Sequence, residues 1–126
     1  LNFQYHITPG IYGFADEDMI SKIIENLFTN ALKYSDKFVE INLFLKEDLK
    51  YWILEIKNDG AILNNREIEY LFKPFHRSIK HSQIEGSGLG LALSHSFALL
   101  HEGDLRYIDN SEKLNIFVLA IPLNLN

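Results

Sequence analysis

Two side-chain amides and one ammonium group recur at helical spacing in the first third of the chain. Asn26, Asn30 and Lys33 stand at positions i, i+4 and i+7, which places them along one side of a helix. Amide oxygens can complete the coordination shell of Mg²⁺, which takes few protein ligands because it keeps several waters, and a lysine supplies a point charge for phosphate. The row predicts the wall of a cleft for a phosphate–metal ligand. From these residues alone, an amphipathic helix whose polar side chains are merely solvated remains an equal alternative.

Apolar residues beside this row indicate a helix that packs on a core. The expected apolar stripe consists of Ile20, Ile24, Leu27 and Ala31, which follow the period of an amphipathic helix. Asp16 is a suitable N-cap, and we expect the helix to end near Ser35. The polar row therefore borders a buried face.

A glycine-rich segment is the second candidate ligand site. Gly86-Ser87-Gly88-Leu89-Gly90-Leu91 places three glycines at alternate positions before a predicted helix, where backbone N–H groups and the helix N-terminus can approach an anion. No Gly-Lys-Ser/Thr follows, so the segment is not a Walker A loop. It is also a poor dinucleotide fingerprint, because its third glycine falls one residue early and no strand precedes it.

Composition narrows the class of protein. A chain of 126 residues is long enough for one domain with its own core, and a net charge of −5 argues against a general nucleic-acid or anionic-membrane surface. The absence of cysteine excludes disulfides and cysteine-based zinc or redox sites. No apolar run is long enough for a transmembrane helix, and the first residue is not Met, so we expect an excised fragment consisting of a single domain, residues 1–126.

Hydrophobic periodicity predicts an alternation of strands and helices. We expect strands at 1–7, 37–46, 51–57, 104–108 and 114–122, a short strand or link at 11–14, and helices at 16–35, 66–71 and 88–101. This grouping is typical of an α+β fold, here a two-layer sandwich in which about three helices cover one face of a mixed sheet of about five strands. The polar stretch 73–87 has little to bury and is a candidate mobile lid.

Four motifs occur in one order along the chain. They are Asn26-x-x-x-Asn30-Ala31-x-Lys33-Tyr34-Ser35, Asn58-Asp59-Gly60, Phe72-Lys73-Pro74-Phe75-His76-Arg77 and the glycine segment 86–91. This order resembles the N, G1, F and G2 boxes of the catalytic, ATP-binding domain of sensor histidine kinases, and the resemblance covers nearly the whole chain. It implies a Bergerat fold that binds ATP and Mg²⁺ between the long helix, the G boxes and the lid.

The resemblance also implies roles for individual residues. Asn30 corresponds to the Mg²⁺ ligand, Asn26 to a residue near the phosphates or the metal, and Lys33 to a phosphate-neutralising group. Tyr34 would border the nucleotide, and Arg77 is a second phosphate candidate, so the catalytic set is Asn26, Lys33 and Arg77. The other positions of the expected nucleotide site are Asn58, Gly60, Ile62, Gly86, Ser87, Gly88, Leu89, Gly90 and Leu91.

The G1 box departs from the family pattern. The usual sequence is Asp-x-Gly-x-Gly, in which the Asp accepts a hydrogen bond from the adenine amino group. Here Asn58 matches the Asp and Ile62 the second glycine. An Asn oxygen can accept the same bond, and a register in which Asp59 takes this role stays open.

The function implied is transfer of the γ-phosphoryl group of MgATP to a histidine on a separate dimerisation domain, upstream of a response regulator receiver domain. Such a domain would be monomeric and cytoplasmic, without nucleic-acid or direct membrane contact, in a protein that could be anchored in the inner membrane. One rival is an ATP hydrolase of the same superfamily, although those enzymes carry Glu at the position of Asn26. The other rival is a non-catalytic, degenerate kinase module that signals by docking.

Overall fold

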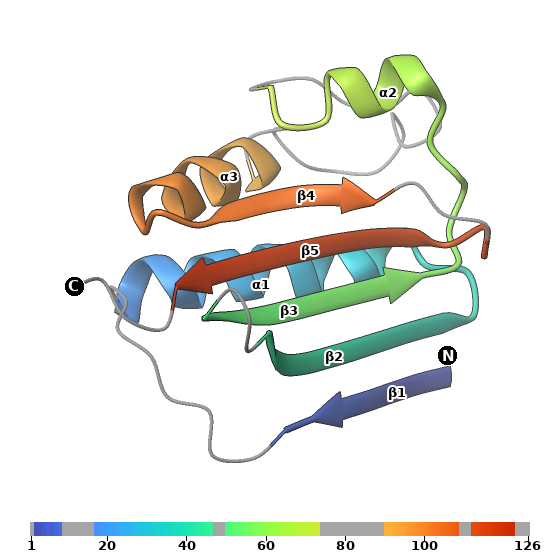
Figure 1. The fold of residues 1–126 in the computed structure, drawn as a ribbon. Helices are drawn as coiled ribbons and strands as arrows, with labels where there is room; N and C mark the ends of the chain where they lie inside the picture. The colour runs from blue at the N-terminus through green and yellow to red at the C-terminus, as the bar shows by residue number, and fades with distance from the viewer. Residues whose placement is uncertain (1, 9–16, 47–49, 74–89, 109–111, 123–126) are drawn as a thin grey trace.

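One mixed sheet backed by helices organises the chain. The computed structural model describes residues 2–8, 17–46, 50–73, 90–108 and 112–122. Its elements are β1 (Asn2–Ile7), α1 (Glu17–Tyr34), β2 (Phe38–Lys46), β3 (Tyr51–Asn58), α2 (Asn65–Glu69), α3 (Gly90–Leu100), β4 (Asp104–Ile108) and β5 (Asn115–Pro122). The sheet order is β1-β2-β3-β5-β4, with β1 parallel to β2 and all other pairs antiparallel. Helices α1 and α3 lie behind this sheet (Figure 1), which confirms the predicted α+β class and its layers.

The predicted elements recur with shifts of a few residues at their ends. The exceptions lie outside the described residues: the extended segment 11–14, the Asp16 N-cap, the lid, and the first two residues of the predicted helix 88–101. Within the described residues, no helix combines the length and the apolarity needed to span a bilayer.

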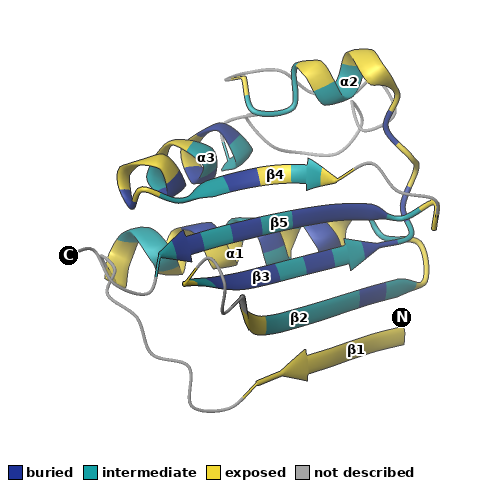
Figure 2. Ribbon diagram, viewed as in Figure 1, coloured by how far each residue is buried: buried dark blue, intermediate teal, exposed yellow. Residues whose placement is uncertain are grey.

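The buried face of the sheet is made by alternate residues of its two central strands. Trp52, Leu54 and Ile56 of β3 join Leu119 and Ile121 of β5 in the main hydrophobic cluster, as the two-residue period of a strand requires. Figure 2 shows these two strands as the most buried elements of the sheet. The core therefore lies between β3, β5 and the two longer helices.

At some alternate positions, β2 and β3 carry charged or polar residues. The Lys57 ammonium lies 3.6 Å from a carboxylate oxygen of Glu55 and 3.7 Å from those of Glu40 and Glu112, and the Asn42 amide bridges Glu40 and Glu55. Desolvation lowers the pKa of Lys57, but the three carboxylates outweigh it and the net pKa is raised. By the alternation of side chains along a strand, this network lies on the face of the sheet opposite the helices.

The apolar stripe of α1 is rotated relative to the prediction. Ile23 is fully buried, with Leu27 and Ala31, whereas Ile24 is 40% exposed. The prediction of Ile24 as a core residue was therefore wrong. Two adjacent isoleucines lie 100° apart on a helix, and the periodicity of the sequence was compatible with either one.

The buried residues of α3 are small. They are Ala92, Ser94 and Ala98, while the larger Leu93 and Leu100 are 46% and 69% exposed. Ser94 contacts Asn26 of α1, and a leucine in its place would force the two helices apart. Leu91 and Phe97 also pack against the core cluster, so α3 packs through small and large residues together.

The residue that adopts the left-handed conformation after α3 is Glu102, and not the neighbouring Gly103. Glu102 has φ = 60°, and the Gly103 N–H donates to the Ala98 carbonyl at 2.9 Å, in the manner of a Schellman cap. Gly103 is required for a different reason, since a Cβ there would lie 2.1 Å from the Ala120 oxygen of β5. The ring of His101 is buried and its Nδ1 contacts the Phe97 carbonyl at 2.8 Å, as expected of a helix-end residue.

Glu102→Gly should stabilise the domain. A non-glycine residue in the left-handed region is strained, and relief of that strain typically stabilises by roughly 0.5–1 kcal/mol. Urea denaturation would measure the gain in the free energy of unfolding. Ser96→Gly, on the exposed side of α3, is the matched control and should destabilise by up to about 1 kcal/mol; equal effects of the two changes would contradict the assignment of strain to Glu102.

Candidate functional site

Asn26 connects α1 to the beginning of α3. Its amide nitrogen donates to Ser94 Oγ at 3.1 Å and to the Gly90 carbonyl at 3.3 Å. A carbonyl can only accept, so the nitrogen of Asn26 must face α3 and its oxygen must point away. Ser94 is completely buried and was not singled out in the sequence, where an isolated serine in an apolar helix carries no signal. The structure thus brings the first polar residue of the predicted row beside the last glycine of the predicted anion loop.

The other residues of the row continue along the same side of α1. Asn30 is half-buried one turn after Asn26, Lys33 is exposed, and Tyr34 is half-buried at the end of the helix. Spacings of four and three residues keep the three polar groups adjacent. The helix therefore presents two amides and an ammonium group along one margin of its buried face, as the sequence predicts.

Gly60 fixes the loop after β3 against the end of α1. A Cβ at Gly60 would lie 2.0 Å from the Tyr34 carbonyl oxygen and 2.9 Å from Asn58 Oδ1, distances that no side chain tolerates. The glycine is thus needed for this close approach of two backbones. It brings the G1 segment to the same end of α1 that carries Lys33 and Tyr34.

Asn58 belongs to a buried network of amides. Its Oδ1 accepts from the Gly60 N–H at 2.9 Å and from Asn115 Nδ2 at 3.3 Å. Asn115 also donates to the Ala61 carbonyl at 3.1 Å, and the Tyr107 hydroxyl donates to Asn115 Oδ1 at 2.7 Å. Both asparagines are only 4% exposed. Sequence reasoning missed Asn115 and Tyr107, because the pairing of β3 with β5 that places them here is a long-range feature.

The Asp59 carboxylate binds the turn between α1 and β2. It accepts from the backbone N–H groups of Asp36, Lys37 and Phe38, at 2.9–3.0 Å. Desolvation raises the pKa of Asp59, but the hydrogen bonds from these backbone groups prevail and lower it overall. Asp59 therefore holds the turn between α1 and β2, an arrangement that favours the register in which Asn58, and not Asp59, matches the Asp of the G1 box.

Asp59→Ala should destabilise the domain in a pH-dependent manner. Its partially exposed carboxylate resembles a helix cap, for which removal costs about 1–2 kcal/mol. The pKa of Asp59 in the folded domain lies below the ordinary value of an aspartate, about 3.9. The stabilisation is therefore complete above that ordinary value and is lost as the pH falls through the lower, folded pKa. Chemical denaturation at several pH values should show the gap between wild type and variant narrowing in acid. Asp36→Ala is the control, with an expected change within about 0.5 kcal/mol; a gap that is constant with pH would contradict the role of the charge.

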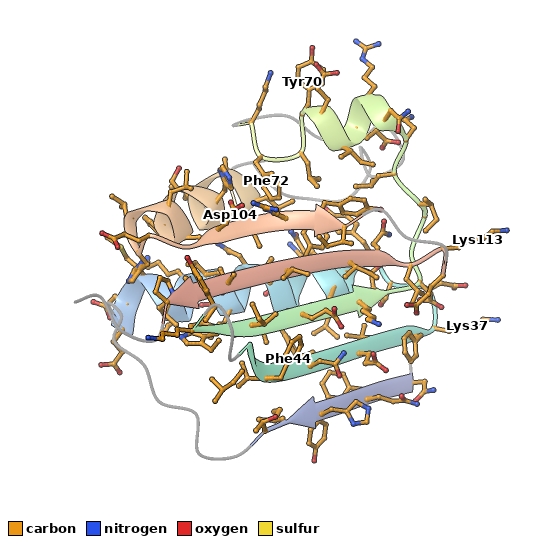
Figure 3. All side chains as sticks on the ribbon, viewed as in Figure 1. Lys37, Phe44, Tyr70, Phe72, Asp104 and Lys113 are labelled. Carbon is orange, nitrogen blue, oxygen red and sulfur yellow. The ribbon has the colours of Figure 1, made fainter. Side chains whose placement is uncertain are left out.

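The segment after α2 is anchored on α3. Phe72 packs against the core cluster and stacks on His95, with ring centroids 4.9 Å apart and an angle of 17°. His95 Nε2 in turn lies 3.6 Å from Asp104 Oδ1. Figure 3 labels Phe72 and Asp104 on this side of the molecule, near α3. Phe72 thus anchors this segment on the core.

Several predicted site residues cannot be placed. Arg77, Gly86, Ser87, Gly88 and Leu89 lie outside the described residues, as does Phe75 of the same motif. Leu91 packs against the core cluster, and Ile62 is 40% exposed. Within the described part, the structure therefore gathers the α1 row, Gly90 and the G1 loop around α1.

The sequence that forms this site matches a known protein family. Residues 15–125 match the model of the histidine kinase-, DNA gyrase B- and HSP90-like ATPases. The chain belongs to this family. Its match spans the polar row of α1, the G1 loop and the beginning of α3.

Relatives within the family are sensor proteins. The heme sensor protein HssS of Staphylococcus aureus is 29% identical over 109 residues, which cover 86% of this chain and 23% of HssS. Among solved structures, the mycobacterial sensor histidine kinase MprB is 27% identical with a TM-score of 0.84, over 96% of this chain and 82% of that one. The Acinetobacter baumannii histidine kinase AdeS is 26% identical with a TM-score of 0.76, over 98% and 54% respectively. The resemblance to the catalytic domain of sensor histidine kinases is therefore confirmed, and this chain spans about a quarter of the length of HssS.

Proposed function

We propose that this domain binds MgATP and transfers the γ-phosphoryl group to a histidine on a separate dimerisation domain, in two-component signal transduction. The observation that carries the proposal is the orientation of Asn26. Its nitrogen is bound to Ser94 and Gly90, so its oxygen is the atom available beside Asn30. The ligand wall then consists of amide oxygens and the ammonium group of Lys33, without a carboxylate.

The donor set suits Mg²⁺ bound together with phosphates. Among the described residues, no group of three or more His, Cys, Asp or Glu could hold a metal ion. A metal at α1 would be bound by the oxygen of Asn30, with Asn26 near it, and by waters and phosphate oxygens. Mg²⁺ is typically bound in this way, with few protein ligands. When bound, the ion would neutralise phosphate charge. The protein's share is to position that oxygen on a rigid helix.

The remaining contacts to ATP would come from both ends of α1. Lys33 would neutralise a phosphate, Tyr34 would border the nucleotide, and the G1 loop held by Gly60 would meet the base. Packing against α1 does not demand a glycine at position 90, where a Cβ would meet Asn26 at an ordinary 3.6 Å. A glycine at this place therefore supports a close backbone approach to the phosphates, together with residues 86–89 and Arg77.

The transfer itself requires positioning more than acid–base chemistry. Phosphoryl transfer depends mainly on alignment and charge neutralisation, and a neutral imidazole is already a nucleophile. The attacking nitrogen forms a bond to the γ-phosphorus while the bond to the bridging oxygen breaks, and ADP leaves. Asn26, Lys33 and Arg77 are the residues we assign to this step.

The partners follow from the same proposal. The histidine would lie on a dimerisation domain of the same kinase, and the phosphoryl group would pass on to the receiver domain of a response regulator. The relative HssS is about four times as long as the matched segment, which leaves room for such domains. We place the domain in the cytoplasm of a kinase that could be anchored in the inner membrane, as a monomer that contacts neither membrane nor nucleic acid.

A phosphotransfer experiment tests the proposal. The chain would be mixed with Mg²⁺, ATP labelled at the γ-phosphate and a histidine-bearing dimerisation domain, either fused or separate. Acid-labile, base-stable label on that domain is expected, and its loss after replacement of the accepting histidine is the control. Absence of nucleotide binding by calorimetry would instead identify a docking module.

A further inference from the structure

The oxygen of Asn58 has no capacity left for a ligand. A carbonyl oxygen offers two lone pairs, and those of Asn58 Oδ1 are taken by the Gly60 N–H and by Asn115 Nδ2. The structure gives the amide nitrogen of Asn58 no acceptor among the described residues. The half of this side chain available to a ligand is therefore a hydrogen-bond donor.

Backbone groups fix this orientation. The Gly60 N–H can only donate, so the Asn58 atom 2.9 Å from it must be the oxygen. The Ala61 carbonyl can only accept, so the Asn115 atom 3.1 Å from it must be the nitrogen, and this nitrogen also faces Asn58. Rotating the Asn58 amide would set its NH₂ group against two other N–H donors in a place that is 4% exposed.

We propose that Asn58 recognises the purine base by donating a hydrogen bond to it from its amide nitrogen. The site would then bind 6-oxopurine nucleoside triphosphates at least as well as ATP. The inference rests on the proposed function and on the match of Asn58 to the Asp of the G1 box, which would place Asn58 at the 6-position of the base. The 6-amino group of adenine is itself a donor and would meet the donor of Asn58, whereas the 6-oxo group of hypoxanthine or guanine accepts from it. An unmatched polar pair at a buried position is costly.

Asn58→Asp reverses the polarity of this contact with little change in shape. A carboxylate keeps an oxygen for the Gly60 N–H and the Asn115 amide, and it presents its second oxygen where the nitrogen was. That oxygen would accept from the adenine amino group and repel a 6-oxo group. The variant therefore changes the base preference without removing either of the two hydrogen bonds.

Calorimetry with the full chain, Mg²⁺ and either ATP or inosine triphosphate tests the proposal, because the bases differ only at the 6-position and in the proton on N1. The wild type should bind inosine triphosphate as tightly as ATP or more tightly. Asn58→Asp should shift the ratio of the two dissociation constants toward ATP by roughly tenfold or more. Asn64→Asp, the same amide-to-carboxylate change at the exposed N-cap of α2, should leave the ratio unchanged.

The outcomes separate the two proposals. A wild type that prefers ATP by tenfold or more overturns the reading of Asn58 and leaves the proposed function standing. Absence of binding of either nucleotide overturns the proposed function and this inference together. If circular dichroism shows that Asn58→Asp does not fold, the wild-type ratio alone decides.

Discussion

Asn30→Ala is expected to abolish Mg²⁺-dependent nucleotide binding while leaving the domain folded. Removal of even the outer-shell partners of a metal typically costs 10–100-fold in affinity, so loss of a direct ligand should weaken MgATP binding by roughly 100-fold or more. The fold should survive, because the half-buried Asn30 makes no side-chain hydrogen bond with the described residues, and alanine favours a helix.

Calorimetry with and without Mg²⁺, together with thermal melts followed by circular dichroism, would measure both effects. Asn30→Asp restores an oxygen but adds charge, and we expect it to fail as well, since the site combines a neutral amide with phosphates. Glu25→Ala is the matched control on the exposed side of α1, and it should bind MgATP like the wild type. Unchanged MgATP affinity in Asn30→Ala would remove Asn30 from the metal site.

The fold was predictable because its signals are local and agree with one another. Alternating strands, turn residues and the periodicity of α1 each indicate one structure, and all five described strands appear within one residue or so of their predicted ends. The order of the sheet was not predictable from periodicity. The insertion of β5 between β3 and β4 depends on pairing between residues far apart in the chain.

Two features of the core could not be read from hydrophobicity alone. Ile23 and Ile24 are equally hydrophobic, and only the direction of the core distinguishes them. In α3 the small residues Ala92, Ser94 and Ala98 are buried, whereas the larger Leu93 and Leu100 are exposed. Hydrophobicity ranks residues by their transfer free energy, whereas the spacing between two helices also depends on side-chain volume.

The candidate site was predictable in its residue types but not in its internal bonds. The row on α1 and the glycine before α3 are visible in the sequence. The bonds that orient Asn26 and Asn58 come from Ser94 and Asn115 respectively, which belong to no recognised motif. Which end of the Asn58 amide faces the ligand depends on Asn115, a partner 57 residues away. From the sequence alone, the Asn at this position could be interpreted only as a weaker hydrogen-bond acceptor than Asp.

The chain by itself is expected to bind ATP and yet to release phosphate very slowly. An ATP hydrolase needs a base that orients or deprotonates water, a contribution typically worth 10²–10⁴-fold. Asn26 stands where hydrolases of this superfamily carry Glu, and an amide has no titratable acceptor. Its nitrogen is moreover bound to Ser94 and Gly90, which holds the side chain in place beside α3.

Glu25 is the carboxylate next to Asn26 on α1, and it is the rival candidate for the base. Glu25 precedes Asn26 by one residue, lies about 100° round the helix from it and is exposed. If Glu25 acted as the base, Glu25→Gln would lower phosphate release by the same 10²–10⁴-fold. If the domain is a kinase, Glu25→Gln should change neither ATP binding nor transfer.

Phosphate release by the purified chain and label transfer to a histidine-bearing domain should be measured side by side, for the wild type and for Glu25→Gln. We expect release far below about 1 s⁻¹, the low end of ordinary enzyme turnover, and transfer only when the accepting domain is present. Sustained release near 1 s⁻¹ that Glu25→Gln abolishes would establish a hydrolase instead. The contrast rests on Asn26, whose amide cannot take a proton from water. If the proposed function is correct, the phosphoryl group is therefore transferred only to a nucleophile that needs no base, such as a neutral imidazole.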